Sequence, residues 1–111
     1  MDEFFEKINF PYSKVRDQQD EFIRKVYDNI LKCKNIMVSA PTGLGKTVSG
    51  LAPALKIAKE KNFSIIYLTS RQTQANQAIK TIKDINTKSK EPINYMAFIG
   101  KRSMCVHPER D

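Results

Sequence analysis

Apolar residues in the first third of the chain recur every three or four positions, with charged residues between them. Between Arg16 and Lys34 the stripe consists of Phe22, Ile23, Val26, Tyr27, Ile30 and Leu31. Side chains three or four positions apart share one face of an α-helix. The spacing therefore predicts one amphipathic helix over 16–34, with Cys33 packed as a small apolar residue on its inner side or at its end.

Two more helical stripes alternate with three short apolar runs along the rest of the chain. The stripes are Val48, Leu51, Ala52, Leu55 and Ala58, and then Ala75, Ala78, Ile79, Ile82 and Ile85. The runs lie at 36–38, 65–68 and 93–99, and the second has no polar alternation, which is typical of a strand buried on both faces of a parallel sheet. Strand, helix, strand, helix, strand predicts an α/β fold built on a parallel sheet with right-handed crossovers.

Size and composition limit what the chain does by itself. Its 111 residues allow one domain near the lower size limit of an independent catalytic domain, and 41% apolar residues indicate a packed core. No apolar run approaches the roughly 18 residues of a membrane span, and the N-terminus lacks the basic-then-apolar order of a secretory signal. We expect a cytoplasmic monomer with no membrane partner.

Positive charge is concentrated in the later part of the chain. Of the formal net charge of +7, residues 1–46 carry eight Lys/Arg against seven Asp/Glu, and residues 47–111 carry eleven against five. Such a field favours phosphate-rich partners through counterion release. Many basic proteins bind no nucleic acid, so a sequence motif is needed in addition to the charge to indicate a phosphate-rich partner.

A glycine-containing segment between the first predicted strand and the second predicted helix supplies that motif. It consists of Ala40, Pro41, Thr42, Gly43, Leu44, Gly45, Lys46 and Thr47. Glycines let the backbone curl so that successive N–H groups and the helix N-terminus face an anion, which indicates an ATP site. Lys46 then reaches the β- and γ-phosphates and the Thr47 hydroxyl ligates Mg²⁺, so both are candidate catalytic residues. The alternative is a plain glycine turn before a helix, which the Gly-Lys-Thr triplet in this setting disfavours.

Several segments together carry a resemblance to one family. They are Phe-Pro-Tyr at 10–12, Arg16 with Gln19, the segment 39–47, Leu-Thr-Ser-Arg at 68–71 with Gln74 and Gln77, and Gly-Lys-Arg-Ser-Met-Cys-Val-His-Pro at 100–108. The chain resembles the XPD-type superfamily 2 DNA helicases, including the DinG relatives, over nearly its whole length. The resemblance implies a RecA-like P-loop NTPase motor, of which residues 1–111 would be the N-terminal, ATP-binding part of motor domain 1, ending at the start of the iron–sulfur region.

The resemblance assigns roles to residues outside the glycine-containing segment. Gln19 would read the adenine edge with its amide donor and acceptor, and Arg16 would brace that region. Ser70, Arg71 and Thr73 would lie near the DNA backbone, although the arginine is shifted by one position from the family's usual Ser-Arg-Thr, which leaves open whether Ser70 or Arg71 makes the contact. A polar N-cap at Thr69 or Ser70 fits the same residues.

Cys105 in its Met-Cys-Val-His-Pro setting resembles the first of four cysteines that hold a 4Fe-4S cluster in this family. A cluster of that kind takes four thiolates, so a chain with two cysteines holds no complete one. Outside this context a lone cysteine is usually an inert thiol. Zinc on Cys105 and His107 fits less well, because two ligands do not fill a tetrahedral site.

The resemblance implies an ATP-dependent DNA helicase that moves 5′ to 3′, unwinds duplex DNA in repair, and binds single strands and forks. No strand is followed by an Asp-Glu pair for hydrolysis, so we expect a chain that is inactive alone. The alternatives are a generic P-loop ATPase and a small basic module that binds nucleotides or nucleic acid.

Overall fold

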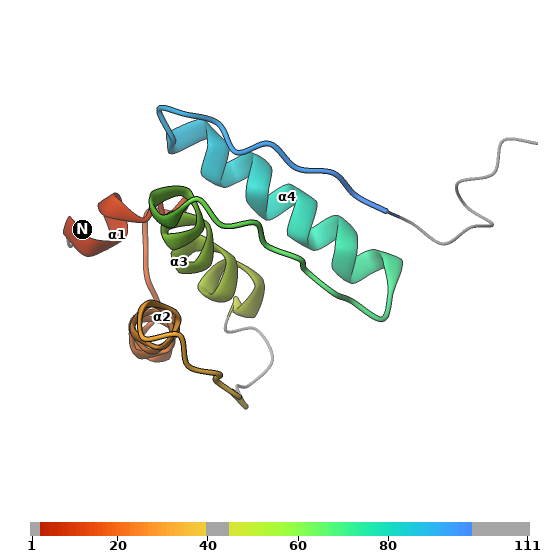
Figure 1. Ribbon diagram of the computed structural model, residues 1–111. Coiled ribbons are helices and arrows are strands. Elements are labelled where there is room, and N and C mark those ends of the chain that lie inside the picture. The colour runs from red at the N-terminus through yellow and green to blue at the C-terminus, as the bar shows by residue number, and fades with distance from the viewer. Residues whose placement is uncertain (1–2, 40–44, 99–111) are drawn as a thin grey trace, which may run out of the picture.

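The computed structural model describes residues 3–39 and 45–98 and contains four helices within them (Figure 1). These are α1 (Glu3–Lys7), α2 (Asp17–Leu31), α3 (Lys46–Lys61) and α4 (Gln72–Lys88). The three helices predicted from the apolar stripes are therefore confirmed. Helix α2 ends three residues earlier than predicted, whereas α3 and α4 each extend beyond their stripes by a few residues at both ends.

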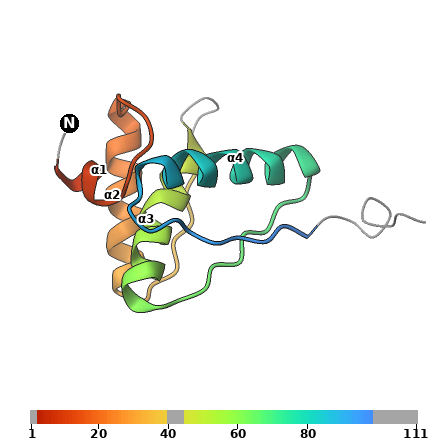
Figure 2. The same ribbon diagram turned by 90° about the horizontal axis from the view of Figure 1, so that it is seen from above.

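Helix α3 lies between α2 and α4 and packs against both of them (Figures 1 and 2). Its buried face carries Leu51, Ala52 and Leu55, which meet Ile23 from α2 and Ile85 from α4 in one apolar core. Of these, Ile23, Ala52 and Ile85 are at most 1% exposed. Burial of an aliphatic side chain of this size contributes about 1.5–3 kcal/mol, so these contacts hold the three long helices together.

The short helix α1 was not predicted, because five residues are too few to show a helical period. It contributes Phe5 to the core, and the segment after it contributes Ile8 and Phe10. The ring centroids of Phe5 and Phe10 lie 5.6 Å apart in an edge-to-face arrangement, and the Phe4 ring meets Tyr27 of α2 at 5.2 Å. Such aromatic pairs add to the apolar burial and fix the N-terminal segment against α2.

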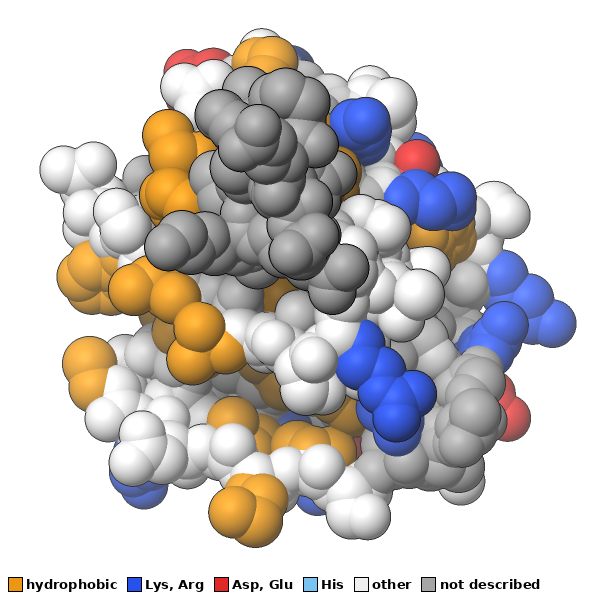
Figure 3. Space-filling model, turned by 90° about the vertical axis from the view of Figure 1, so that its right-hand side faces the viewer, with side chains coloured by type: hydrophobic (Ala, Val, Ile, Leu, Met, Phe, Trp, Pro, Cys, Tyr) orange, Lys and Arg blue, Asp and Glu red, His pale blue; other side chains and the backbone are white. Residues whose placement is uncertain are grey.

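None of the three predicted strands is formed among the residues that the structure describes. Segments 63–69 and 92–98 are extended and lie along α4, and segment 35–39 follows α2 without regular structure (Figures 1 and 2). Several of their apolar side chains reach the surface; Met37, Ile66 and Leu68 are 99%, 84% and 86% exposed, and apolar side chains gather on the face that Figure 3 shows.

The missing sheet has a physical reason. A parallel strand is stable where neighbouring strands satisfy its backbone and helices cover both of its faces. Here α4 covers one side of segments 63–69 and 92–98 through Ala78, Ile79 and Ile82, and the other side is open. The apolar runs have the composition of strands, but the described residues do not pair them.

Cys33 corrects another prediction. It is exposed, not packed, and it has a left-handed backbone with a φ of 57° in the turn that ends α2. Its N–H donates to the carbonyl of Ile30 at 3.0 Å, while the N–H of Lys34 donates to Asn29 at 2.8 Å. This pattern satisfies the last helix carbonyls, so position 33 belongs to the helix terminus and not to the apolar stripe. No helix in the described parts of the chain has the length and apolar character needed to cross a membrane.

Candidate functional site

Helix α3 begins directly after Gly45, the last glycine of the motif. Gly45 has a left-handed backbone, with φ 83° and ψ 49°. Its carbonyl oxygen accepts hydrogen bonds from the N–H of Ser49 at 3.1 Å and from the Ser49 hydroxyl at 2.7 Å. Only glycine adopts this backbone conformation without steric cost, and the conformation places Lys46 and Thr47 at the positive end of the helix dipole.

Gln19 of α2 lies against this helix start. Its side chain is 4% exposed, and its Nε2 donates to the carbonyl oxygen of Gly45 at 3.3 Å. Its Oε1 accepts the N–H of Arg16 at 3.3 Å, so both ends of the amide have partners. Arg16 is the N-cap residue of α2. The two residues that the resemblance assigns to the adenine region therefore lie next to the end of the glycine-containing segment.

A cavity of about 370 Å³ lies between the first turns of α3 and α4. Its lining is formed by Lys46, Thr47, Tyr67, Leu68, Thr69, Thr73, Gln74 and Gln77. Lysine is the one charged residue among them, and most of the others carry a hydroxyl or an amide that forms hydrogen bonds. The N-terminal turns of both helices contribute to the lining, and each adds a partial positive charge. The cavity thus suits an anionic ligand with several oxygen atoms.

The structure brings Thr73 to this cavity and leaves Ser70 and Arg71 outside its lining. Arg71 is the N-cap residue of α4, so Thr69 and Ser70 do not take that position as one interpretation of the sequence expected. The Ser70 hydroxyl donates to Oε1 of Gln74 at 3.4 Å, and the Thr69 hydroxyl donates to the carbonyl of Arg71 at 3.2 Å. Ser70, Arg71 and Thr73 still lie within about one turn of each other, beside the cavity.

Gln74 and Gln77 were not named as site residues, although both line the cavity with Lys46. Their spacing of three positions was the available signal, because residues at i and i+3 share a helix face. Both residues were part of the family resemblance, but no ligand was assigned to them. The contact depends on how α4 packs against α3, which a single helix pattern does not contain.

The described residues fit Mg-ATP in part and do not fit an iron–sulfur cluster. The N-terminus of α3, the exposed Lys46 and the half-buried Thr47 hydroxyl are donors and ligands for phosphate and Mg²⁺. Ala40, Pro41, Thr42, Gly43, Leu44 and Cys105 lie outside the described residues. Within 3–39 and 45–98 no group of three His, Cys, Asp or Glu side chains could hold a metal.

Comparison with known proteins places the chain in a family. Residues 16–107 match the model of the DEAD/DEAH box helicases. A probable ATP-dependent helicase of Methanocaldococcus jannaschii is 37% identical over 81 residues, which cover 73% of this chain and 12% of that protein. The XPD helicase subunit of general transcription and DNA repair factor IIH of Saccharomyces cerevisiae is 26% identical over 112 residues, which cover 92% of this chain and 14% of that protein.

The chain thus spans about an eighth of the length of these relatives. No solved structure was found to match it. The family match extends over most of the sequence, including the start of α3, Gln19 and the cavity residues of α4. The chain belongs to the DEAD/DEAH box helicases and is similar to their XPD-type members.

Proposed function

We propose that residues 1–111 form the N-terminal, ATP-binding part of the first motor domain of an ATP-dependent DNA helicase. The family implies ATP, Mg²⁺ and a RecA-like P-loop NTPase fold. The observation that supports the assignment of residues is the cavity that joins Lys46 and Thr47 of α3 to Thr73 of α4. In this arrangement a nucleotide site and a candidate nucleic-acid site share one wall.

We assign a role to each residue of the nucleotide site. The N–H groups at the start of α3 and the segment 40–45 bind phosphate oxygens, Lys46 neutralises the β- and γ-phosphates, and the Thr47 hydroxyl ligates Mg²⁺. Gln19 and Arg16 belong to the adenine end. Both hydrogen bonds of the Gln19 amide are 3.3 Å long, slightly beyond the usual range of about 2.7–3.2 Å, so we expect them to be weak and to give way to an adenine edge.

The DNA part of the proposal uses Ser70, Arg71 and Thr73. They lie at the start of α4, where a helix N-terminus and a guanidinium favour a phosphate of the DNA backbone. The finer proposal is a cytoplasmic, monomeric enzyme that moves 5′ to 3′ in DNA repair and binds single strands and forks. Of these properties, the name of the yeast relative, a helicase subunit of a DNA repair factor, supports the role in DNA repair. In a longer protein Cys105 would supply one of four thiolates of a 4Fe-4S cluster.

Titration of the chain with Mg-ATP tests the nucleotide site. We expect Lys46→Ala to weaken binding at least tenfold, because it removes the cation that faces the phosphates. Lys61→Ala is the matched control, since Lys61 is an exposed lysine in the last turn of the same helix. Helical circular dichroism should be the same for both variants. Equal titration curves for the wild type and Lys46→Ala would overturn the assignment.

A further inference from the structure

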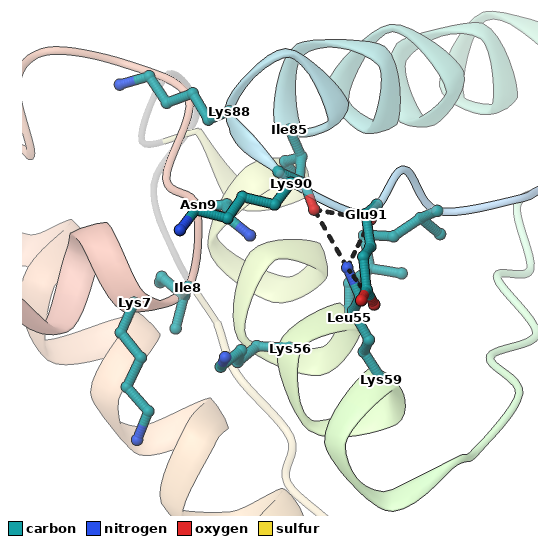
Figure 4. A pocket seen from close by; sticks show the side chains of 12 residues that line it. Lys7, Ile8, Asn9, Leu55, Lys56, Lys59, Ile85, Lys88, Lys90 and Glu91 are labelled. Carbon is teal, nitrogen blue, oxygen red and sulfur yellow. Dashed lines mark hydrogen bonds and ion pairs between the residues drawn. The ribbon is translucent and has the colours of Figure 1, made fainter.

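A second cavity, of about 290 Å³, lies at the other end of α3 from the candidate nucleotide site (Figure 4). Its lining includes Lys7 at the end of α1, Lys56 and Lys59 of α3, and Lys88 and Lys90 at the end of α4. Glu91 is the one acidic residue in the lining. Five lysines from three separate segments of the chain therefore surround one hollow.

Not all of these lysines are engaged within the protein. Lys59 donates to the Ser89 hydroxyl at 3.2 Å and forms an ion pair with Glu91 at 3.6 Å, and Lys56 pairs with Glu60 at 3.1 Å. Lys59 therefore fixes the turn that carries Lys88 and Lys90. Those two lysines are exposed, and no hydrogen bond or ion pair to them is found among the described residues.

The floor of the cavity differs from its rim. Ile8, Leu55 and Ile85 line it, and they are 1%, 8% and 1% exposed. The hollow thus has a floor of mostly buried aliphatic side chains, of which Leu55 is the most exposed, and ammonium groups around its edge. A ligand that matches both has an apolar ring and a phosphate, as a nucleotide does.

We propose that this basic cavity binds a single-stranded nucleic acid, with one base against the aliphatic floor and the neighbouring phosphates at the lysine rim. The proposal rests on the proposed binding of DNA by the chain. A strand fits better than a free mononucleotide, because Lys56 and Lys59 are paired with glutamates and the other three lysines still carry more positive charge than one phosphate group neutralises. A backbone that crosses the cavity brings several phosphates to the rim.

The basic cavity is separate from the candidate DNA contact at Arg71. Lys46 is the first residue of α3, and Lys56 and Lys59 lie ten and thirteen positions later. At about 1.5 Å per residue the two ends are roughly 15–20 Å apart. Similarly, Arg71 and Lys88 flank opposite ends of α4. Loss of one site therefore leaves the other in place.

The test measures the fluorescence anisotropy of a labelled oligothymidylate with the 111-residue chain over a series of salt concentrations. The variant is Lys88→Gln/Lys90→Gln, and its control is Lys34→Gln/Lys83→Gln, which removes the same charge from exposed positions outside the cavity. We expect the first pair to weaken binding several-fold more than the control. We also expect its slope of log affinity against log salt to fall by about 1.4, at about 0.7 for each lost phosphate contact.

Two further measurements separate this inference from the proposed function. If Arg71→Gln weakens binding while the Lys88/Lys90 pair behaves like its control, the basic cavity is not a binding site and the contact at Arg71 stands. If the lysine pair weakens binding and Arg71→Gln does not, the cavity binds the strand and the contact at Arg71 fails. Thymidine monophosphate can be added as a competitor at constant ionic strength. If it removes the part of the oligothymidylate binding that depends on Lys88 and Lys90, the cavity binds a mononucleotide and the assignment to a strand is overturned.

Discussion

The Nε2 atom of Gln19 lies 3.3 Å from the carbonyl oxygen of Gly45, and this contact joins the first turn of α2 to the residue directly before α3. A Cβ atom on residue 45 would lie 2.6 Å from the same Nε2. Gln19 therefore occupies the space that only a glycine leaves free. The polar contact between two helices and the left-handed turn at Gly45 depend on each other, and both lie next to Lys46.

Gly45→Ala should destabilise the chain. A left-handed backbone costs a residue with a Cβ roughly 1–2 kcal/mol, and the contact with Gln19 adds to that cost. Gly50→Ala is the control within the same helix, because nothing lies within 4 Å of its would-be Cβ. Alanine in a helix interior gains about 0.5–1 kcal/mol over glycine. Urea unfolding should therefore shift in opposite directions for the two variants.

The double variant Gln19→Ala/Gly45→Ala isolates the steric part of this effect. Removal of the Gln19 amide frees the space for the new Cβ, so we expect the double variant to be more stable than the sum of the two single changes predicts. Strict additivity in urea unfolding would show that the two residues do not meet.

Tyr12 should contribute to the free energy of unfolding in a way that changes with pH. Partial burial, followed by the negative charge of Asp84 and the 3.2 Å hydrogen bond to it, raises the pKa of the Tyr12 phenol above its ordinary value. A raised pKa means that the folded state favours the neutral phenol. The contribution of Tyr12 to stability is therefore complete below about pH 10, and it is lost as the pH rises through the pKa of Tyr12 in the folded state. We expect Tyr12→Phe to cost about 0.5 kcal/mol at pH 7.

The cost of Tyr12→Phe should be constant below pH 10 and should fall as the pH rises above 10 towards the raised pKa of Tyr12, as measured by thermal unfolding over pH 7–11. Tyr95→Phe is the control, because Tyr95 is exposed to a similar extent, 43% against 37% for Tyr12, and no hydrogen bond from its hydroxyl is found within the described residues. A constant difference between the wild type and Tyr12→Phe across this range would contradict the effect of Asp84.

Asn86 should hold the segment 92–98 against α4. Its Nδ2 donates to the carbonyl of Ile93 at 3.1 Å, and its Oδ1 accepts the N–H of Ile93 at 2.8 Å. Loss of two partly buried hydrogen bonds costs about 1–3 kcal/mol, so Asn86→Ala should accelerate hydrogen exchange at the Ile93 amide. Asn76→Ala, at an exposed position of the same helix, should leave that amide unchanged. Equal protection in both variants would show that the segment is held by its apolar contacts instead.

The iron–sulfur proposal is tested by iron content. The 111 residues include two cysteines, and one cluster needs four thiolates, so the chain should purify without stoichiometric iron even under anaerobic conditions. A longer protein with the same N-terminal residues should bind iron, and Cys105→Ser should lower its iron content. Cys33→Ser is the control, since Cys33 is exposed at the end of α2 and is not proposed as a ligand. Full iron content in the Cys105→Ser protein would make Cys105 an ordinary thiol.

The helices were predictable because their apolar stripes are local. Ile23, Leu51 and Ile85 each mark the buried face of one helix, and each is buried in the structure. A helix after the glycines was also predicted, although α3 starts at Lys46, inside the glycine-containing segment and two residues before its apolar stripe. These features depend on residues within a few positions of each other, so a linear pattern contains them.

The sheet and the cavity were less predictable because they depend on distant residues. The runs 36–38 and 65–68 have the composition of strands, but a strand forms only when it pairs with other strands, and its own residues do not determine which segments those are. Gln74 and Gln77 reach the cavity only because α4 packs against α3. Likewise Cys33 was misassigned, since the hydrogen bonds that end α2 decide its exposure.

The open side of segments 63–69 and 92–98 has a consequence for synthesis on the ribosome. The contacts of α2, α3 and α4 use residues within the first 88 positions, so this helical core can condense as soon as they leave the exit tunnel. The exposed Ile66 and Leu68 lie outside this core, so their side chains remain in contact with water after the three helices have packed. Apolar segments exposed at that stage are the ones that chaperones shield from aggregation.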